Sequence, residues 1–315
     1  MKKKDKKDSI RFWNEHAEVW QEKAYDKKGE YLNFPVSQQR QDITAQKIEE
    51  MADNKNVSII DFGCADGELV RALLKKGFIN AKGMDNSTKM IETAKKMLKE
   101  EMPDIEPDKI FFVGDADNFD KREKFDFVVA MGLIEYLIDI DKFFQNLKSI
   151  LKPGGFALVE SRNKFFNLFS ANELTFQSSL SELAEELKDA KRFSPVVSEQ
   201  ETEKAIKNAF ISVAKNLEKP AKKSERNEMK IFNKFPFQLP QFTPKEIESF
   251  SQKQGLKLEH VIYYHFHPFL PKFENEFPVI FNKIALQMQP LGYTILGATV
   301  CSSFIALIKK YENNK

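Results

Sequence analysis

Short apolar runs alternate with longer amphipathic segments between residues 56 and 162. The segments between the runs carry apolar residues at helical spacing, which is typical of helices that pack on a sheet. This alternation predicts an α/β fold whose parallel sheet is covered by helices on both faces. The apolar runs predict strands at 56–63, 80–87, 109–116, 124–132 and 156–161.

Residues with known helix-end preferences mark the boundaries of the predicted helices. Ser87 or Thr88 is the expected N-cap of a helix that follows the second strand. Thr243 is the expected N-cap of a later helix, with Pro244 at its first position and Gly255 just past its end. The predicted helix that begins near residue 138 is expected to end at 153–154, where the sequence reads Pro-Gly.

The alternation of short runs and helices stops after residue 162 and returns near residue 243. The segment between them is charged and helix-prone, which predicts a helical insertion or lid. An apolar stretch at 291–308 carries hydroxyl and β-branched residues, so a buried strand is favoured over a membrane anchor, and a last strand is placed at 302–310. The predicted divisions are a basic tail (1–8), a helical cap (9–50), a core (51–162 and 243–311) and the insertion (163–242).

Composition narrows the class of protein. The chain has 315 residues, 42% of them hydrophobic, and a formal net charge of +2, so a purely electrostatic nucleic-acid binder is not expected. Cys64 and Cys301 are the only cysteines, too few for a disulfide framework, and a reducing cytoplasm fits them. The basic start lacks an apolar segment and is not expected to be a signal peptide. Stable membrane insertion is not expected either.

Ligands of such sheets bind at the carboxyl ends of the strands. The positions of interest are therefore 61–67, 85, 114–117, 131–136 and 160–162. After the first strand, Asp61 and Gly63 precede Gly67, which matches neither the dinucleotide fingerprint nor a phosphate-binding loop. Carboxylates at Asp61 and Asp66 would repel a pyrophosphate. The ligand is expected to carry positive charge or many hydrogen-bond donors.

Two further carboxylates suit an adenosine. Asp85 ends the second strand, where it can accept hydrogen bonds from both hydroxyls of a ribose. Asp115 follows the third strand beside Ala116, where its carboxylate can accept an adenine amino group. A cationic adenosine ligand satisfies all of these positions.

Several segments together resemble a known family. "SIIDFGCADG", "GMDNSTKMIETAKK", "FFVGDADNF", "FDFVVAMGLIEYL" and "LKSILKPGGFALVES" resemble, in order and spacing, the motifs of class I S-adenosylmethionine-dependent methyltransferases. The opening "RFWNEHAEVWQEKAYD" resembles the N-terminal cap of the small-molecule branch. The likeness covers 9–162 and returns at 243–310. It implies a Rossmann-like, seven-stranded, mostly parallel sheet with an antiparallel last strand, and S-adenosyl-L-methionine as cofactor.

The resemblance also implies roles for matched positions. Asp61 would orient the donor's ammonium group, Asp85 would hold its ribose, and the glycine loop would lie under its methionine and ribose. Asp66 departs from the family pattern, which has a small or hydroxyl residue there. The predicted cofactor-binding residues are Asp61, Gly63, Cys64, Ala65, Gly67, Asp85, Asn86, Met90, Asp115, Ala116, Met131, Gly132, Leu133, Tyr136, Trp20 and Arg40.

Residues of the cap offer further contacts. Arg40 either meets the donor's carboxylate or lies on a solvated helix face. Trp13, Trp20 and Tyr25 either close over the donor's sulfonium as cation–π partners or pack within the cap. Glu135 is expected to be solvated, and Cys64 is expected to be half-buried beside the loop rather than reactive.

A base for the transfer is sought among the histidines. His265 and His267 are two residues apart on a predicted strand, so they share one of its faces. They are candidate bases, or ordinary hydrogen-bonded histidines, or a metal pair that lacks a third ligand; no metal site is expected. His16 on the cap is a rival base.

The expected reaction is an in-line displacement at a sulfonium methyl, in which the protein mainly positions the reactants. The expected partner is a small-molecule acceptor, such as a sugar, a lipid-linked compound or a secondary metabolite, methylated on oxygen or nitrogen. Two alternatives stay open: methylation of a protein or RNA, and a non-catalytic protein that binds S-adenosylmethionine. The sequence does not specify the acceptor or the oligomeric state.

Overall fold

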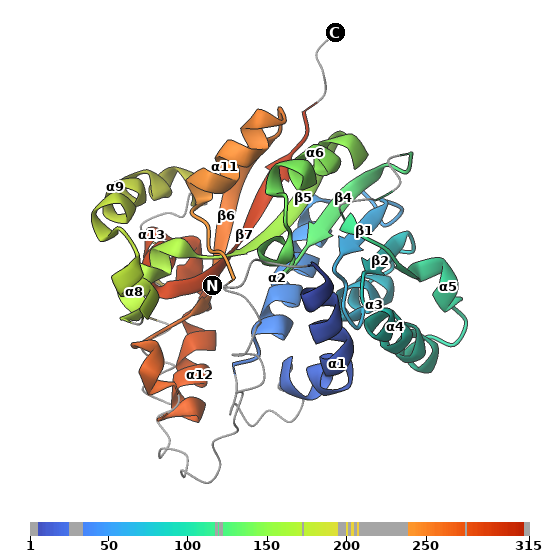
Figure 1. Cartoon of the computed structure of the whole chain (residues 1–315), viewed down its shortest axis with the longest axis horizontal. Helices are drawn as coiled ribbons and strands as arrows, with labels where there is room; N and C mark the ends of the chain where they lie inside the picture. The colour runs from blue at the N-terminus through green and yellow to red at the C-terminus, as the bar shows by residue number, and fades with distance from the viewer. Residues whose placement is uncertain are drawn as a thin grey trace.

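The structure is a computed structural model of the whole chain (Figure 1). It describes residues 6–24, 34–116, 119, 122–171, 173–194, 239–274 and 276–311, together with residues 200, 203, 204 and 207. Tyr25, the start of the predicted tail and most of the second half of the predicted insertion lie outside the described residues.

Seven strands form a single sheet in the order β3-β2-β1-β4-β5-β7-β6. Strands β1 to β5 pair in parallel, and β7 pairs antiparallel to both β5 and β6. The prediction of a mostly parallel, seven-stranded sheet with an antiparallel last strand is therefore confirmed. The strands are β1 (Ile59–Phe62), β2 (Ala81–Asp85), β3 (Phe111–Val113), β4 (Phe125–Ala130), β5 (Leu151–Arg162), β6 (Lys257–Phe266) and β7 (Cys301–Lys309).

Helices cover both faces of the sheet, as Figure 1 shows. Alternate residues of each strand point to opposite faces, so Ile59 packs with the helices of one face and Ile60 with those of the other. The first face carries α2 (Val36–Met51), α3 (Glu68–Lys75) and α4 (Thr88–Glu101). The second carries α6 (Ile140–Ile150) and α11 (Pro244–Lys253). Further α-helices in the described part of the chain are α1 (Lys6–Ala24), α5 (Pro107–Ile110), α7 (Asn167–Ser170), α8 (Glu173–Gln177), α9 (Leu180–Ala190), α12 (Pro278–Gln287) and α13 (Ile295–Val300).

The predicted helix caps are present. The Ser87 hydroxyl accepts a hydrogen bond from the Met90 amide, so Ser87 rather than Thr88 is the N-cap of α4. Thr243 and Glu246 form a reciprocal capping box at the start of α11. Each cap satisfies amides that the first turn of a helix leaves without a helical partner.

Three local predictions are wrong. The expected third strand begins only at Phe111, because α5 occupies the preceding residues. The helix before β5 ends at Ile150, so the Pro-Gly pair lies inside β5 and does not end the helix. The expected strand at 291–308 is helical over Ile295–Val300, where the Thr294 hydroxyl accepts from the Leu296 amide and caps α13, and the strand begins at Cys301.

Gly67 lies at a close contact between the first loop and β3. Its φ is +73°, and it precedes α3 as the N-cap. A Cβ atom placed there would overlap the ring of Phe111, far inside van der Waals contact. The first turn of α3 therefore approaches β3 as closely as it does because residue 67 has no side chain.

We expect Gly67→Ala to lower the free energy of unfolding by about 2–4 kcal/mol, because it combines left-handed strain with overpacking against Phe111. Gly154→Ala is the matched control, since Gly154 has φ +79° and open space where a Cβ atom would lie. The control should lose only about 1–2 kcal/mol of backbone strain. Urea unfolding of both variants measures the difference, and equal losses would contradict the steric explanation.

Candidate functional site

A pocket opens at the carboxyl ends of β1 to β5, with a cavity volume of about 220 Å³. The strand ends supply its floor, and α1 and α2 supply side chains above them. Its lining residues are Ser9, Trp13, Trp20, Arg40, Gly63, Ala65, Met84, Asp85, Asn86, Met90, Gly114, Asp115, Ala116, Met131, Gly132, Leu133, Glu135, Tyr136, Leu137, Glu160, Arg162 and Leu239. All but three of the predicted cofactor-binding residues are among them; Asp61, Cys64 and Gly67 are the exceptions.

The loop after β1 is held to the end of β2 by one carboxylate. The Ala65 amide donates to Asp85 Oδ2 at 3.0 Å, and the Ser87 amide donates to Asp85 Oδ1 at 2.8 Å. Gly63 and Ala65 both have positive φ, which turns the loop backbone sharply beside the pocket. Burial raises the pKa of Asp85 to about 6, although the amide hydrogen bonds oppose this shift. The carboxylate is therefore ionised at neutral pH and available to a ligand at the pocket wall.

Asp61 lies beneath this loop and is almost fully buried, with 4% of its surface exposed. Its Oδ1 atom has no hydrogen-bond partner among the residues that the structure describes. Burial raises the pKa of Asp61 to about 8; the positive charge of Arg40 opposes the shift and the charge of Asp85 adds to it. A buried carboxyl with an unsatisfied oxygen is costly unless a cation or donor approaches it. The site therefore suits a positively charged ligand.

Two aromatic residues of α1 close one side of the pocket. The rings of Trp13 and Trp20 meet edge to face with centroids 5.2 Å apart, and Trp13 also contacts Tyr136 at 5.7 Å. Asn14 Oδ1 accepts hydrogen bonds from the Ser87 hydroxyl at 2.8 Å and from the Lys89 amide at 3.2 Å. The α1 helix is thus attached to the same turn that positions Asp85.

The opposite side of the pocket contains two acidic and two basic residues. Arg40 Nη1 donates to Glu160 Oε2 at 3.0 Å, and the Tyr264 hydroxyl donates to Glu160 Oε1 at 2.7 Å. Glu135 Oε1 accepts from the Arg162 amide at 2.9 Å. Burial and the nearby charge of Glu160 raise the pKa of Glu135 to about 7. The expectation that Glu135 is solvated is wrong, because only 2% of its surface is exposed.

Two of the predicted cofactor residues outside the pocket lining have packing roles. Cys64 is buried rather than half-buried, and burial raises the pKa of its thiol well above the usual value. Its sulfur and the Phe111 ring lie where a side chain at Gly83 would be, so the loop packs closely on β2. Gly67 permits the close contact with Phe111 described above. The third, Asp61, supports the loop from below.

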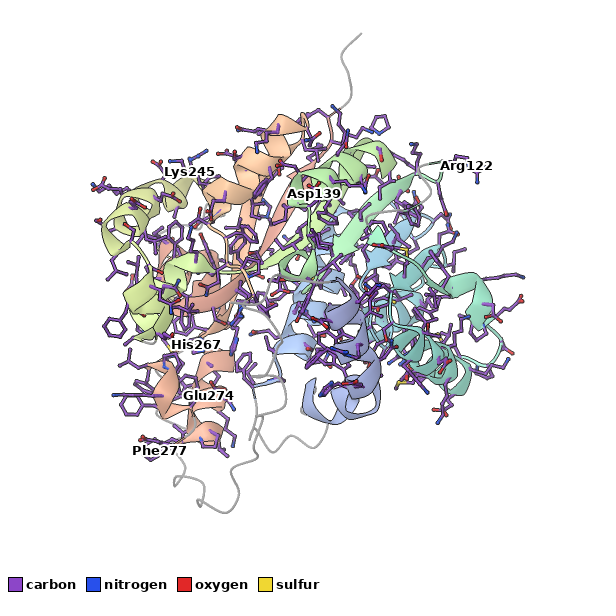
Figure 2. The ribbon with its side chains drawn as sticks, in the orientation of Figure 1. Arg122, Asp139, Lys245, His267, Glu274 and Phe277 are labelled. Carbon is purple, nitrogen blue, oxygen red and sulfur yellow. The ribbon has the colours of Figure 1, made fainter. Side chains whose placement is uncertain are left out.

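The three predicted bases do not line this pocket. His16 Nδ1 lies 2.7 Å from the Phe12 carbonyl oxygen, and its ring stacks on Phe12. His267 lies beside α12 (Figure 2), where its ring centroid is 5.7 Å from that of Phe281, and burial lowers its pKa to about 4. A catalytic role for any of these histidines stays a prediction.

His265 lies in a strained part of the same region. Its φ is +59°, its amide donates to Gln39 Oε1 at 3.0 Å, and its Nδ1 lies 2.7 Å from the Ser302 hydroxyl. Its ring stacks on Phe34, and burial lowers its pKa well below the usual value. The imidazole is therefore neutral at physiological pH.

Some lining residues were not assigned a role from sequence. Gly114, Glu160 and Arg162 fall within the strand-end positions that the fold singles out, so topology locates them without defining their function. Ser9 and Leu239 have no such signal, because they come from segments outside the sheet. Met84 is a core residue of β2 whose contact with the pocket depends on how the strand ends.

No helix among the described residues has both the length and the apolar character needed to span a membrane. Within the same part of the chain, no three histidine, cysteine or acidic side chains are grouped as they would be around a metal ion.

The fold and the site define a class I α/β protein with a pocket at its strand ends that suits a cationic ligand. A family model described as a methyltransferase domain matches residues 36–261. The chain therefore belongs to the methyltransferase family, and is a class I enzyme that uses S-adenosylmethionine as its cofactor.

Two relatives show the range of this likeness. The chain is 30% identical over 200 residues to malonyl-[acyl-carrier protein] O-methyltransferase 1 of Ilyobacter polytropus, covering 60% of this chain and 69% of that protein. It is 27% identical over 166 residues to the ubiquinone biosynthesis O-methyltransferase of Coxiella burnetii, covering 52% of this chain. That second match spans only 65% of the relative's own length.

Solved structures share the fold. Magnesium protoporphyrin IX methyltransferase from Synechocystis PCC 6803, determined with bound SAH, has a TM-score of 0.56 at 13% identity, covering 97% of this chain and 100% of that one. A chain of the Haloferax volcanii complex between the Trm112 activator and a methyltransferase has a TM-score of 0.51 at 14% identity, covering 95% of this chain and 98% of that one.

Proposed function

We propose that this protein transfers a methyl group from S-adenosylmethionine to an oxygen or nitrogen atom of a small-molecule acceptor. The observation that carries the proposal is the joint placement of the loop after β1, Asp85 and Asp115 around one pocket at the strand ends. The names of the two relatives, both O-methyltransferases, support oxygen as the acceptor atom.

The residues present suit the cofactor. In this proposal Asp85 accepts hydrogen bonds from the ribose hydroxyls, while Asp115 and Ala116 flank the adenine. The unsatisfied oxygen of Asp61 provides negative charge close to the donor's ammonium group. Arg40 provides positive charge for the donor's carboxylate. Each assignment pairs a charged or polar group of the ligand with an opposite or complementary group of the protein.

When bound, S-adenosylmethionine supplies an activated methyl group on a sulfonium, with a neutral thioether as leaving group. The protein's part is then to orient the acceptor, exclude water and receive a proton. The pocket wall between the loop after β1 and the side that holds Glu135 and Glu160 includes Met131, Gly132 and Leu133. Positioning of this kind contributes about 7–11 kcal/mol to lowering a barrier.

Glu135 is the base that we favour in this proposal. It lines the pocket, whereas His16, His265 and His267 do not. Burial raises the pKa of Glu135 above its usual value, which suits a carboxylate that accepts a proton near neutral pH. Its hydrogen bond from the Arg162 amide fixes the carboxyl group at the end of β5.

The proposal is tested with donor labelled on its methyl group and a cell extract separated by ultrafiltration into small and large molecules. We expect the label to enter the small-molecule fraction, with release of S-adenosylhomocysteine. Asp85→Asn is the negative control, because its carboxylate holds the cofactor loop. Label found only in protein or RNA would refute a small-molecule acceptor, and absence of any transfer would favour a non-catalytic binding protein.

A further inference from the structure

Arg162 is the last residue of β5 and lies at the mouth of the pocket. Side chains two residues apart on a strand share a face, so Glu160 and Arg162 both reach the pocket. Glu160 is buried with 4% of its surface exposed, whereas Arg162 is exposed. The strand therefore presents a carboxylate in the depth of the pocket and a guanidinium at its opening.

The two arginines of the pocket differ in their partners. Arg40 is paired with Glu160 at 3.0 Å, and the side chains are 15% and 5% exposed. Within the part of the chain that the structure describes, the Arg162 guanidinium has no ion pair or hydrogen bond; its contact to Glu135 is made by the backbone amide. Arg162 thus offers planar donors, in the geometry that carboxylates and phosphates accept, to whatever enters the pocket.

Arg162 lies on the side of the pocket away from the cofactor loop. Burial raises the pKa of Glu135 and of Tyr136, in the connection between β4 and α6, and the positive charge of Arg162 opposes this rise. Arg40 lies beside Gly132 and Glu160, and its charge opposes the raised pKa of Asp61 beneath the loop. In the order of the sheet, β4 separates β5 from β1, and β2 lies one strand further away, so Arg162 at the end of β5 is distant from the loop after β1 and from Asp85.

Apolar side chains line the same pocket as Arg162. Leu137 and Leu239 line the pocket, and Trp13 borders it from α1. A guanidinium among apolar side chains is matched by a molecule with an apolar body and one anionic end. Such a molecule would gain both from burial and from a charge-assisted hydrogen bond.

We propose that Arg162 anchors an anionic group, most simply a carboxylate, on the methyl acceptor, so that the acceptor is an acid with an apolar body. This inference rests on the proposed function, since it assigns Arg162 to the acceptor and Arg40 to the donor. The anionic group provides the anchor, and the methylated atom is a separate question.

The experiment uses matched probes with the same six-carbon chain: hexanoate, hexyl phosphate and 1-hexanol. Both tryptophans of the chain, Trp13 and Trp20, line the pocket, so their fluorescence reports binding directly. Each probe is titrated into the full-length protein saturated with S-adenosylhomocysteine. We expect hexanoate to bind at least about tenfold more tightly than 1-hexanol, as expected for a hydrogen bond to a charged group.

Arg162→Gln should bring the ratio of the dissociation constants of 1-hexanol and hexanoate close to one. The dissociation constant of S-adenosylhomocysteine should stay within about twofold of the wild-type value. Arg122→Gln is the control arginine; it precedes β4, lies at the edge of the molecule in Figure 2 and should keep the preference. Stronger binding of hexyl phosphate than of hexanoate would identify the anion as a phosphate and keep the proposal. An unchanged preference in Arg162→Gln would overturn it.

Two outcomes separate this inference from the proposed function. If Arg162→Gln weakens S-adenosylhomocysteine as much as hexanoate, Arg162 holds the donor and the inference fails while the function stands. If the wild type does not bind S-adenosylhomocysteine but binds hexanoate through Arg162, the proposed function fails and the anion site remains. Circular dichroism melts of both variants establish that each is folded before the titrations are compared.

Discussion

Asp85→Asn is expected to raise the dissociation constant for S-adenosylhomocysteine by about 10- to 100-fold, the loss associated with hydrogen bonds to a charged group. One carboxylate performs two tasks: it accepts from the Ala65 and Ser87 amides, and it faces the pocket. In the variant the amide NH₂ replaces one acceptor and points a donor at a backbone N–H. Both the loop and the ribose contact are therefore weakened together.

Quenching or enhancement of the Trp13 and Trp20 fluorescence measures this change at pH 7.5, where Asp85 is ionised. Asp104→Asn is the matched control, because Asp104 is exposed and does not line the pocket. If both variants bind S-adenosylhomocysteine like the wild type, Asp85 does not hold the ribose. A melting temperature near that of the wild type shows that lost affinity is not lost folding.

The candidate residues at the strand ends could be predicted because buried runs alternate with helices along the sequence, as they do in a parallel sheet. Each buried run ends in residues that all reach one edge, so Gly63, Asp85 and Asp115 could be grouped from the sequence alone. The antiparallel position of β7 came from the family resemblance rather than from its residues, which are equally compatible with a parallel strand.

The environment of single side chains was harder to predict. Glu135 is a charged residue after a strand, and its burial follows from its hydrogen bond to the Arg162 amide, a contact between residues far apart in sequence. The left-handed backbone of His265 depends in the same way on the Gln39 side chain of α2. The residues at Ile295–Val300 predict a strand because β-branched side chains favour strands, whereas in the structure the Thr294 hydroxyl caps a helix there.

Binding of S-adenosylhomocysteine is expected to strengthen as pH rises from 6 to 7.5, by about tenfold per pH unit, because Asp61 must lose its proton. In the free protein burial holds the pKa of Asp61 at about 8, so the carboxyl is mostly protonated over this range. An ammonium group close to Asp61 favours the charged form and lowers that pKa in the complex. The complex then holds fewer protons than the free protein, which gives affinity that increases with pH.

Fluorescence titrations at three pH values measure the slope, and calorimetry in two buffers of different ionisation enthalpy measures the released proton. Asp61→Asn should bind S-adenosylhomocysteine more weakly than the wild type at pH 7.5. Its affinity should change little with pH, because the amide does not titrate. The folding stability of the ligand-free protein depends on pH in the opposite direction. Asp61 loses its proton near pH 4 in the unfolded chain but only near pH 8 in the folded protein, so the free energy of unfolding of the wild type falls between these two values. Asp61→Asn should not show this fall. If the affinity of Asp61→Asn rises with pH as steeply as that of the wild type, the released proton belongs to another group and Asp61 does not contact the ammonium group.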